Sequence, residues 1–395
     1  MEQHTIEALT TLSQTDVFVT PQVFDMDVTE DVRALESLLH AGCVRVVHDV
    51  YVEQLEELFF VHNPQLVFHP EGKQRFEQQV ADLKTKKPLA LQGVWVYFPW
   101  DASLTHLLKE ADFVSVRTAR NTYLITPQEA AMYQQATVAI AGMSIGSSIA
   151  LALGMQGVGG SLRLADMDTL ALSNTNRILA GVTELGLPKV VMVARRLWEI
   201  NPYLRIEIFQ EGLTEKNITT FFKGAQVIID EVDSLAAKVR IREEAKKQKI
   251  PVVMAADCGE SSILDVERYD HEPQPAFFHN RLGDLTVEQV RQLHKKDIGR
   301  LIATHVGIEN HNERMLYSLT EMGKSVVSWP QLGSTALLNA AAVAFCVRHV
   351  LSGAPLFDNR TVISFEQLLE PKKEESAAHS RAEIEAKFRA MFDIL

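Results

Sequence analysis

Short apolar runs alternate with longer amphipathic segments through most of the chain, as strands alternate with helices in α/β proteins. The alternation is most regular between residues 136 and 270. The predicted strands there are "TVAIAG", "SLRLADMD", "LRIEIFQE", "AQVIIDEVD" and "IPVVMAAD". Near-continuous apolar strands separated by helices are typical of a parallel sheet that is covered on both faces. This part of the chain is therefore predicted to be an α/β, Rossmann-like, doubly wound domain with a mainly parallel sheet.

The N-terminal part shows the same alternation on a smaller scale. The strand-like segments "CVRVVHDV" and "LQGVWVYF" flank the helical segments "YVEQLEELFFVHN" and "GKQRFEQQVADLKTK". This pattern predicts an extra α/β domain over residues 1–110. A connector follows and ends in a helix, with Thr126 as its N-cap and Pro127 at its first position.

The C-terminal part, residues 271–395, is predicted to be a helical region that covers a substrate cleft. Its most apolar segment runs from about Gly333 to Gly353 and contains Asn339, Arg348 and many alanines. Such a segment predicts a buried helix rather than a membrane span. The chain end reads as a charged stretch followed by a short helix. The chain is thus divided into regions 1–110, 111–270 and 271–395.

Composition narrows the classes of function. The 395 residues are 46% hydrophobic and 23% charged, as in globular proteins, and the net charge is −12. This charge argues against a general affinity for nucleic acid. Cys43, Cys258 and Cys346 are far apart, so neither a disulfide framework nor a zinc site is predicted. The N-terminus lacks a basic region followed by an apolar run, which predicts a cytoplasmic protein without a signal peptide.

A glycine turn follows the first strand of the central region. Gly142, Ser144 and Gly146 lie between that strand and an apolar helix. Such a turn lets backbone N–H groups and the helix N-terminus approach a phosphate. Asp166 ends the next strand, 20 residues beyond Gly146, where a carboxylate can accept hydrogen bonds from ribose hydroxyls. A tight strand-to-helix connection without a ligand is the alternative interpretation of the same turn.

Polar and charged residues follow later elements of the central region. They are Asn174, Asn176 and Arg177 in "SNTNR", Lys189 in "GLPKVV", and Asp230 and Asp233 in "IIDEVDS". All fall at the carboxyl edge of the predicted sheet, where α/β proteins bind ligands. Each has a structural alternative: Lys189 as a solvated helix residue, Arg177 as a salt-bridge partner and Asp233 as a helix N-cap. Their joint occurrence favours a site for a polyanion.

The order of glycine turn, "D-x-D", "SNxNR", "G-x-P-K", "INP" and "D-x-x-DS" resembles the ThiF/MoeB family of ubiquitin-activating-type adenylyltransferases, over roughly residues 117–270. In that family the domain binds ATP with Mg²⁺ and adenylates a carboxylate, commonly the C-terminal glycine of a ubiquitin-like sulfur carrier. The resemblance implies that Asp166 holds the ribose and Asp233 the Mg²⁺. It implies ATP-binding roles for Gly142, Ser144, Gly146, Asp166, Asn174, Arg177 and Lys189.

The resemblance also implies a homodimer. Arg117 and Arg120, in "VRTARN", match the position of an arginine that family members extend into the neighbouring subunit's site. Arg120 is the residue that we expect to act in this way. The expected catalytic residues are therefore Arg177, Lys189, Asp233 and Arg120.

Two further resemblances refine the family assignment. "NTNR" and "IDEVDS" are also similar to the tRNA threonylcarbamoyladenosine dehydratases, and the segment from "DEVDSLAAK" to "LDVERYD" resembles poorly characterised bacterial proteins. The chain departs from the family in its glycine turn, "GMSIGS", which is one residue shorter than G-x-G-G-x-G. The zinc-binding cysteines of many members are missing, so no zinc is expected. Cys258 is predicted to be a small buried residue rather than a nucleophile.

The leading hypothesis is an ATP-dependent adenylyltransferase that activates the carboxylate of a ubiquitin-like carrier protein, a peptide or a small molecule and releases pyrophosphate. Joining two anions requires positioning and charge neutralisation, which an arginine fork, a lysine and Mg²⁺ supply. One alternative is a tRNA-modifying dehydratase that uses the same adenylation step. Another is a non-catalytic nucleotide-binding scaffold. An NAD-dependent dehydrogenase would leave the Asn/Arg/Lys cluster unexplained.

Overall fold

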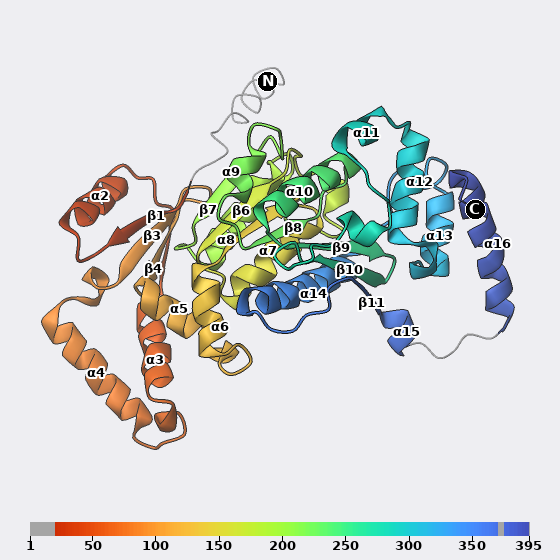
Figure 1. The fold of residues 1–395 in the computed structure, drawn as a ribbon. Coiled ribbons are helices and arrows are strands. Elements are labelled where there is room, and N and C mark those ends of the chain that lie inside the picture. The colour runs from red at the N-terminus through yellow and green to blue at the C-terminus, as the bar shows by residue number, and fades with distance from the viewer. Residues whose placement is uncertain (1–19, 370–374, 395) are drawn as a thin grey trace. The chain divides into compact units, whose positions relative to one another are not determined.

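The computed structural model describes residues 20–369 and 375–394 of the chain (Figure 1). The described residues form two compact units. Residues 20–127 and 198–203 belong to the smaller unit, and the remainder belongs to the larger one. The roles assigned to regions 1–110, 111–270 and 271–395 stay predictions.

The smaller unit is built on a four-stranded sheet with the order β1-β3-β4-β2. Its strands are β1 Gln22–Asp25, β2 Val46–Asp49, β3 Val94–Phe98 and β4 Ser103–Leu107, and its helices are α2 Thr29–His40, α3 Tyr51–His62, α4 Gly72–Lys86 and α5 Glu110–Thr118. The pair β2–β4 is parallel, and the pairs β1–β3 and β3–β4 are antiparallel. The predicted N-terminal α/β domain is confirmed in its element types, because β2, α3, α4 and β3 all fall within the segments expected for them.

The larger unit contains a seven-stranded sheet with the order β11-β10-β9-β8-β5-β6-β7. Its strands are β5 Thr137–Ala141, β6 Ser161–Ala165, β7 Ile206–Phe209, β8 Val227–Asp230, β9 Val252–Cys258, β10 Ser261–Glu267 and β11 Arg360–Ser364. β5 to β9 are parallel, and β10 and β11 add an antiparallel edge. The predicted Rossmann-like, mainly parallel sheet is thus confirmed.

Helices cover both faces of this sheet. They are α6 Pro127–Gln135, α7 Ile145–Gln156, α8 Lys189–Ile200, α9 Ile218–Phe222, α10 Leu235–Gln248 and α14 Gly333–Ser352. Figure 1 shows α9 and α10 on one side of the sheet and α7 and α14 on the other. Because both faces are covered, residues 138–141 of β5 are fully buried. This burial explains the continuous apolar runs in the sequence.

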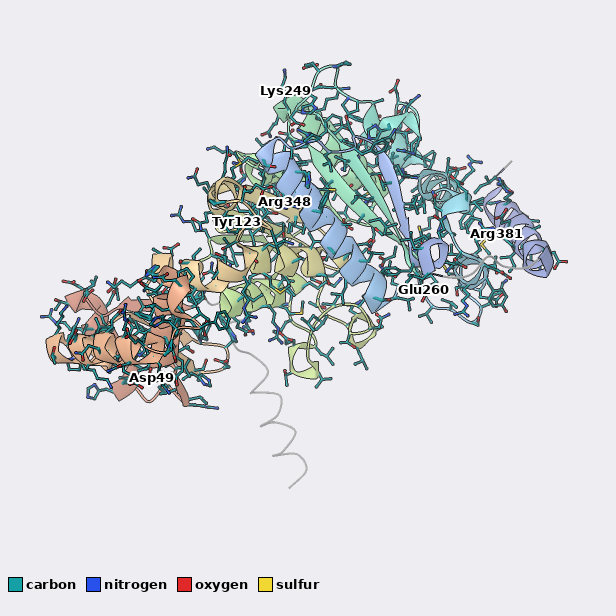
Figure 2. All side chains as sticks on the ribbon, turned by 90° about the horizontal axis from the view of Figure 1, so that it is seen from below. Asp49, Tyr123, Lys249, Glu260, Arg348 and Arg381 are labelled. Atoms are coloured by element: carbon teal, nitrogen blue, oxygen red, sulfur yellow. The ribbon has the colours of Figure 1, made fainter. Side chains whose placement is uncertain are left out.

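α14 is the helix predicted to be buried. By length and composition it is apolar enough to cross a membrane, and it is the one such helix in the described part of the chain. It packs against α7, β9 and β10 instead, and Ala336, Asn339, Val343 and Val347 are among its buried residues. Figure 2 shows it lying across the sheet. α14 is therefore a core helix of the larger unit.

The C-terminal part is mostly helical, as predicted. Its other helices are α11 Val287–Gln292, α12 Lys295–Val306, α13 Glu313–Thr320, α15 Phe365–Leu369 and α16 Glu375–Phe392. α16 is longer than the short helix expected at the chain end. Residues 370–374 and 395, which belong to the same prediction, lie outside the described residues.

The strand order places a topological switch point between β5 and β8. The chain moves from β5 to β6 on one side, whereas β8 pairs with β5 on the other side. Ala141 lies opposite both Ala165 and Asp230 in the two parallel pairings. Residues 142, 166 and 231 therefore leave the sheet side by side. Open α/β sheets bind ligands at such a point, outside the carboxyl ends of the strands.

Gly142 makes the close contact at this point. Its φ is +91°, and a Cβ there would overlap the carbonyl group of Glu231 and lie 2.9 Å from the Val232 nitrogen. Both the backbone conformation and the space beside it therefore require glycine. The turn after β5 is shaped by the backbone that follows β8.

We expect Gly142→Ala to lower the free energy of unfolding by about 3 kcal/mol or more, because left-handed strain and steric overlap act together. Gly186→Ala is a matched control, since Gly186 has a φ of +86° and no atom within 4 Å of the position that a Cβ would take. The control carries the strain alone, about 1 kcal/mol. Urea unfolding of both variants measures the difference. Equal destabilisation would contradict the steric role of the Glu231 carbonyl.

Candidate functional site

Asp166 connects the glycine turn to the loop after β6. Its Oδ2 accepts a hydrogen bond of 2.6 Å from the backbone N–H of Met143, and its Oδ1 accepts one of 2.8 Å from the N–H of Asp168. The two strands are parallel neighbours, so the carboxylate reaches from one strand end to the other. Each carboxylate oxygen retains further acceptor capacity for a ribose hydroxyl.

Lys189 is held at the same edge. It is the first residue of α8 and is buried. Its ammonium group lies 2.8 Å from the Oδ2 of Asp168, and its backbone N–H donates to the Asp168 carbonyl at 2.9 Å. The alternative of a solvated helix lysine is therefore wrong. Sequence reasoning found Asp168 only as the second acid of "D-x-D", although it positions the lysine.

Arg177 lies directly beside the glycine turn. Its Nε donates to the Oγ of Ser144 at 3.0 Å, and its Nη1 donates to the Oδ1 of Asn176 at 2.9 Å. Ser144 is the N-cap residue of α7. Burial lowers the pKa of Arg177, and the nearby carboxylates of Asp257 and Asp233 act in the opposite direction. A half-buried guanidinium thus faces the start of α7.

The three acids at the end of β8 and just beyond it differ in their surroundings. Asp230 is fully buried and forms ion pairs with Arg242 and with Lys238. Glu231 is buried, and its Oε1 accepts the N–H of Ala255 at 2.9 Å. Asp233 is exposed and close enough to Arg177 to interact with it electrostatically.

The N-cap of α10 is Ser234, not Asp233. The Ser234 side chain accepts a hydrogen bond from the backbone N–H of Ala237 at 3.4 Å. The structural alternative for Asp233, a helix cap, is therefore wrong. The Asp233 carboxylate is exposed at the carboxyl edge of the sheet.

Three other predicted site residues have local contacts. Asn174 uses its Oδ1 within its own loop, where it accepts the N–H of Ala171 at 3.0 Å. A Cβ at Gly146 would lie 3.0 Å from the Ile140 side chain, so this glycine lets α7 pack closely on β5. Arg120 is exposed in a short 3-10 turn of the smaller unit. Its role in a partner's site stays a prediction.

Sequence reasoning missed Asp257, near the end of β9. Its Oδ2 accepts from the Nε2 of Gln331 at 3.0 Å, and its Oδ1 accepts from the Nδ2 of Asn339 at 2.5 Å. The Gln331 carbonyl in turn accepts from the Nδ2 of Asn176 at 2.9 Å. Burial raises the pKa of Asp257 to about 6. The sequence did contain a signal for Asp257, because it is an acid at the end of the otherwise apolar predicted strand "IPVVMAAD".

Cys258 follows Asp257 but faces the opposite side of β9. Its Sγ is buried, 4.0 Å from the Nε2 of His311. Burial raises the pKa of the thiol well above its ordinary value. The prediction of a small buried residue agrees with this environment.

The site therefore combines a glycine turn, two fixed cations and the carboxylates of Asp166, Asp168, Asp233 and Asp257. Arg177 bonds to the turn directly at Ser144. Lys189 is joined to the turn through Asp168 and Asp166, and Asp166 holds the turn itself. Backbone donors together with an arginine and a lysine are the groups that bind phosphates. The arrangement is suited to a polyanion with a sugar attached.

Comparison with known proteins gives consistent matches. The ThiF family model matches residues 118–363. An uncharacterized protein of Mycobacterium tuberculosis is 34% identical over 302 residues, which are 75% of this chain and 42% of that protein. The tRNA threonylcarbamoyladenosine dehydratase of Escherichia coli is 28% identical over 160 residues, 38% of this chain and 59% of the relative. The sulfur carrier protein ThiS adenylyltransferase of Escherichia coli is 32% identical over 116 residues, which are 29% of this chain and 46% of that protein. The chain thus spans between 42% and 59% of these relatives' lengths.

The raised pKa of Asp257 predicts a pH-dependent effect on stability. The folded state keeps this proton up to about pH 6, whereas the unfolded chain loses it near pH 4, so ionisation opposes folding between these values. Asp257→Asn cannot ionise. We expect the free energy of unfolding of this variant, relative to the wild type, to rise by about 2 kcal/mol between pH 4 and pH 7. Urea unfolding at several pH values measures this difference, and a pH-independent difference would contradict the burial of the charge.

Proposed function

Because the chain belongs to the ThiF family, we propose that it is an ATP-dependent adenylyltransferase, which transfers AMP to a carboxylate and releases pyrophosphate. One observation carries the proposal: Arg177 bonds to the residue that caps the glycine-turn helix, while the buried Lys189 is fixed beside the same turn through Asp168 and Asp166. Two fixed cations at this position match the three phosphates of ATP better than the pyrophosphate of NAD.

The proposed roles follow from the donor chemistry. The turn at Gly142, Ser144 and Gly146 lies against the phosphates, and Asp166 accepts from the ribose. Arg177 offers parallel N–H donors to phosphate oxygens, and Lys189 supplies a compact charge, with Asn174 beside them. Attack of a carboxylate at the α-phosphate concentrates negative charge there, and these cations stabilise that charge in the transition state.

Asp233 is the proposed Mg²⁺ ligand. Its exposed carboxylate lies near Arg177 and has the oxygen chemistry that Mg²⁺ prefers. In the described residues no three His, Cys, Asp or Glu side chains are grouped to hold an ion by themselves. Phosphate oxygens and water would therefore complete the coordination, as is usual for Mg²⁺ with nucleotides. The ion would neutralise phosphate charge during transfer.

The proposed substrate is the carboxylate of a ubiquitin-like or sulfur-carrier protein, a peptide or a small molecule. A relative that is named as acting on a sulfur carrier protein supports this class.

We further propose a cytoplasmic homodimer in which Arg120 reaches the partner's site. Calorimetry tests nucleotide choice directly: ATP with Mg²⁺ should bind and NAD(H) should not.

A tRNA-directed dehydratase is the second candidate. The similarity to the Escherichia coli enzyme of that name favours it, because it covers 160 residues of this chain. The net charge of −12 is unfavourable for general binding to RNA. Pyrophosphate exchange in the presence of carrier proteins, peptides or tRNA distinguishes the two candidates.

We expect Arg177→Ala and Lys189→Ala each to slow ATP–pyrophosphate exchange by roughly 100-fold, since one charge-assisted donor to a phosphoryl transition state contributes on the order of 3 kcal/mol. Lys247→Ala removes an exposed lysine of α10 and is the matched control for loss of charge. Exchange at the wild-type rate in both site variants would place the active site elsewhere.

The dimer proposal is tested by mixing two inactive variants. Arg120→Ala subunits keep their own Lys189, and Lys189→Ala subunits keep the arginine that reaches across. Half of a random mixture is heterodimer with one complete site, so we expect about a quarter of the wild-type exchange rate. A mixture as inactive as its parents, or a fully active monomer, would contradict the arrangement.

A further inference from the structure

A buried group of hydrogen-bond acceptors lies beside the candidate site. Asp257 is 4% exposed and Asn339 is 0% exposed. Each Asp257 oxygen accepts one amide hydrogen bond, from Asn339 and from Gln331 respectively. A carboxylate has about four acceptor positions, so two remain on Asp257.

The Asn339 amide adds a further unused acceptor. Its Oδ1 is buried and has no hydrogen-bond partner among the described residues. Buried polar atoms in proteins are almost always paired, and an unpaired one calls for a donor from a ligand or from water. The group around Asp257 and Asn339 therefore offers acceptors to a donor that the protein does not itself supply.

Hydrogen bonds connect this acceptor group to Arg177. The Gln331 side chain donates to Asp257, and the Gln331 backbone carbonyl accepts from the side chain of Asn176. The Asn176 side-chain oxygen in turn accepts from Arg177. Asp257 and Arg177 also interact electrostatically. The cation and the buried acceptors are therefore linked at the same edge of the sheet.

Gln331 shows how a donor can be placed on Asp257. Its side chain is half-buried and comes from the segment that precedes α14. Its amide N–H occupies one acceptor position of the carboxylate at 3.0 Å. An N–H group of a bound molecule has the same chemistry and can occupy one of the two acceptor positions that remain on Asp257.

We propose that Asp257 and Asn339 form a subsite that binds an N–H group, amide or ammonium, on the carbon next to the carboxylate being adenylated. The inference rests on the proposed adenylation, because Arg177 is there assigned to the reacting anions. The subsite selects amino acids, N-acyl amino acids and peptide ends over simple carboxylic acids.

Three closely related acids test the subsite in ATP–pyrophosphate exchange, and 4-oxopentanoate matches N-acetylglycine in size. N-acetylglycine carries the N–H group, N-acetylsarcosine replaces its hydrogen by a methyl group, and 4-oxopentanoate replaces the nitrogen by a methylene group. In the wild type we expect kcat/KM for N-acetylglycine to exceed the other two values by roughly 10- to 100-fold, since an acid without the N–H group leaves the buried Oδ1 of Asn339 unpaired.

Substitutions assign the selectivity to named residues. In Asp257→Asn and in Asn339→Leu the preference for N-acetylglycine should fall to within about threefold, and calorimetry with ATP confirms that each variant still binds nucleotide. Glu260→Gln is the matched control. Glu260, labelled in Figure 2, is an exposed carboxylate in the turn after β9, and the full preference should remain in this variant.

The outcomes separate this inference from the proposed function. Exchange with all three acids at similar kcat/KM, or an unchanged preference in both Asp257→Asn and Asn339→Leu, would overturn the subsite and leave adenylation standing. Absence of exchange with every small acid in a wild type that binds ATP would overturn the subsite, and absence of exchange with carrier proteins, peptides and tRNA as well would overturn the adenylation. If Asp257→Asn fails to fold, Asn339→Leu alone decides.

Discussion

The carboxylate of Asp166 is the interaction on which the candidate site depends. One oxygen holds the N–H of Met143 in the glycine turn, and the other holds the N–H of Asp168. Asp168 then binds Lys189 through both its side chain and its carbonyl. A single side chain thus fixes both the turn that is proposed to face a phosphate and the cation that would neutralise its charge.

The rest of the site is assembled from segments that are far apart in the sequence. Asn176 and Gln331 are 155 residues apart and share a hydrogen bond. Glycine at position 333 is needed there, because a Cβ would lie 2.7 Å from the Asn176 carbonyl. The C-terminal region is therefore one wall of the site, and the residues proposed to bind ATP and the acceptor group around Asp257 depend on the same packing.

Much of this fold was predictable because strands buried on both faces leave continuous apolar runs. β10 was missed for a physical reason: it is fully buried, yet it contains Asp265 and Glu267, whose charges are paired with Arg360 and Arg242. Buried ion pairs hide a strand from an apolar pattern. The position of polar residues at the carboxyl edge of the sheet was likewise predictable where those residues directly follow the end of a strand.

Partners across long sequence separations could not be read from the sequence. Asp257 pairs with side chains that are 74 and 82 residues away, so no local spacing reveals it. The N-cap of α10 lies one residue beyond the alternative considered for Asp233, because Asp233 and Ser234 are both good caps and only geometry chooses between them. The role of Arg120 depends on a second subunit and stays a prediction.

The contact between Gly142 and Glu231 also bears on the order in which the chain can acquire its site. The two residues are far apart in sequence, and the backbone after β8 is what confines the turn after β5. Contacts of this kind form late, since a long loop must close before they are made. During synthesis, a chain that has not yet reached Val227 carries every residue of the glycine turn and still lacks the backbone that gives the turn its shape.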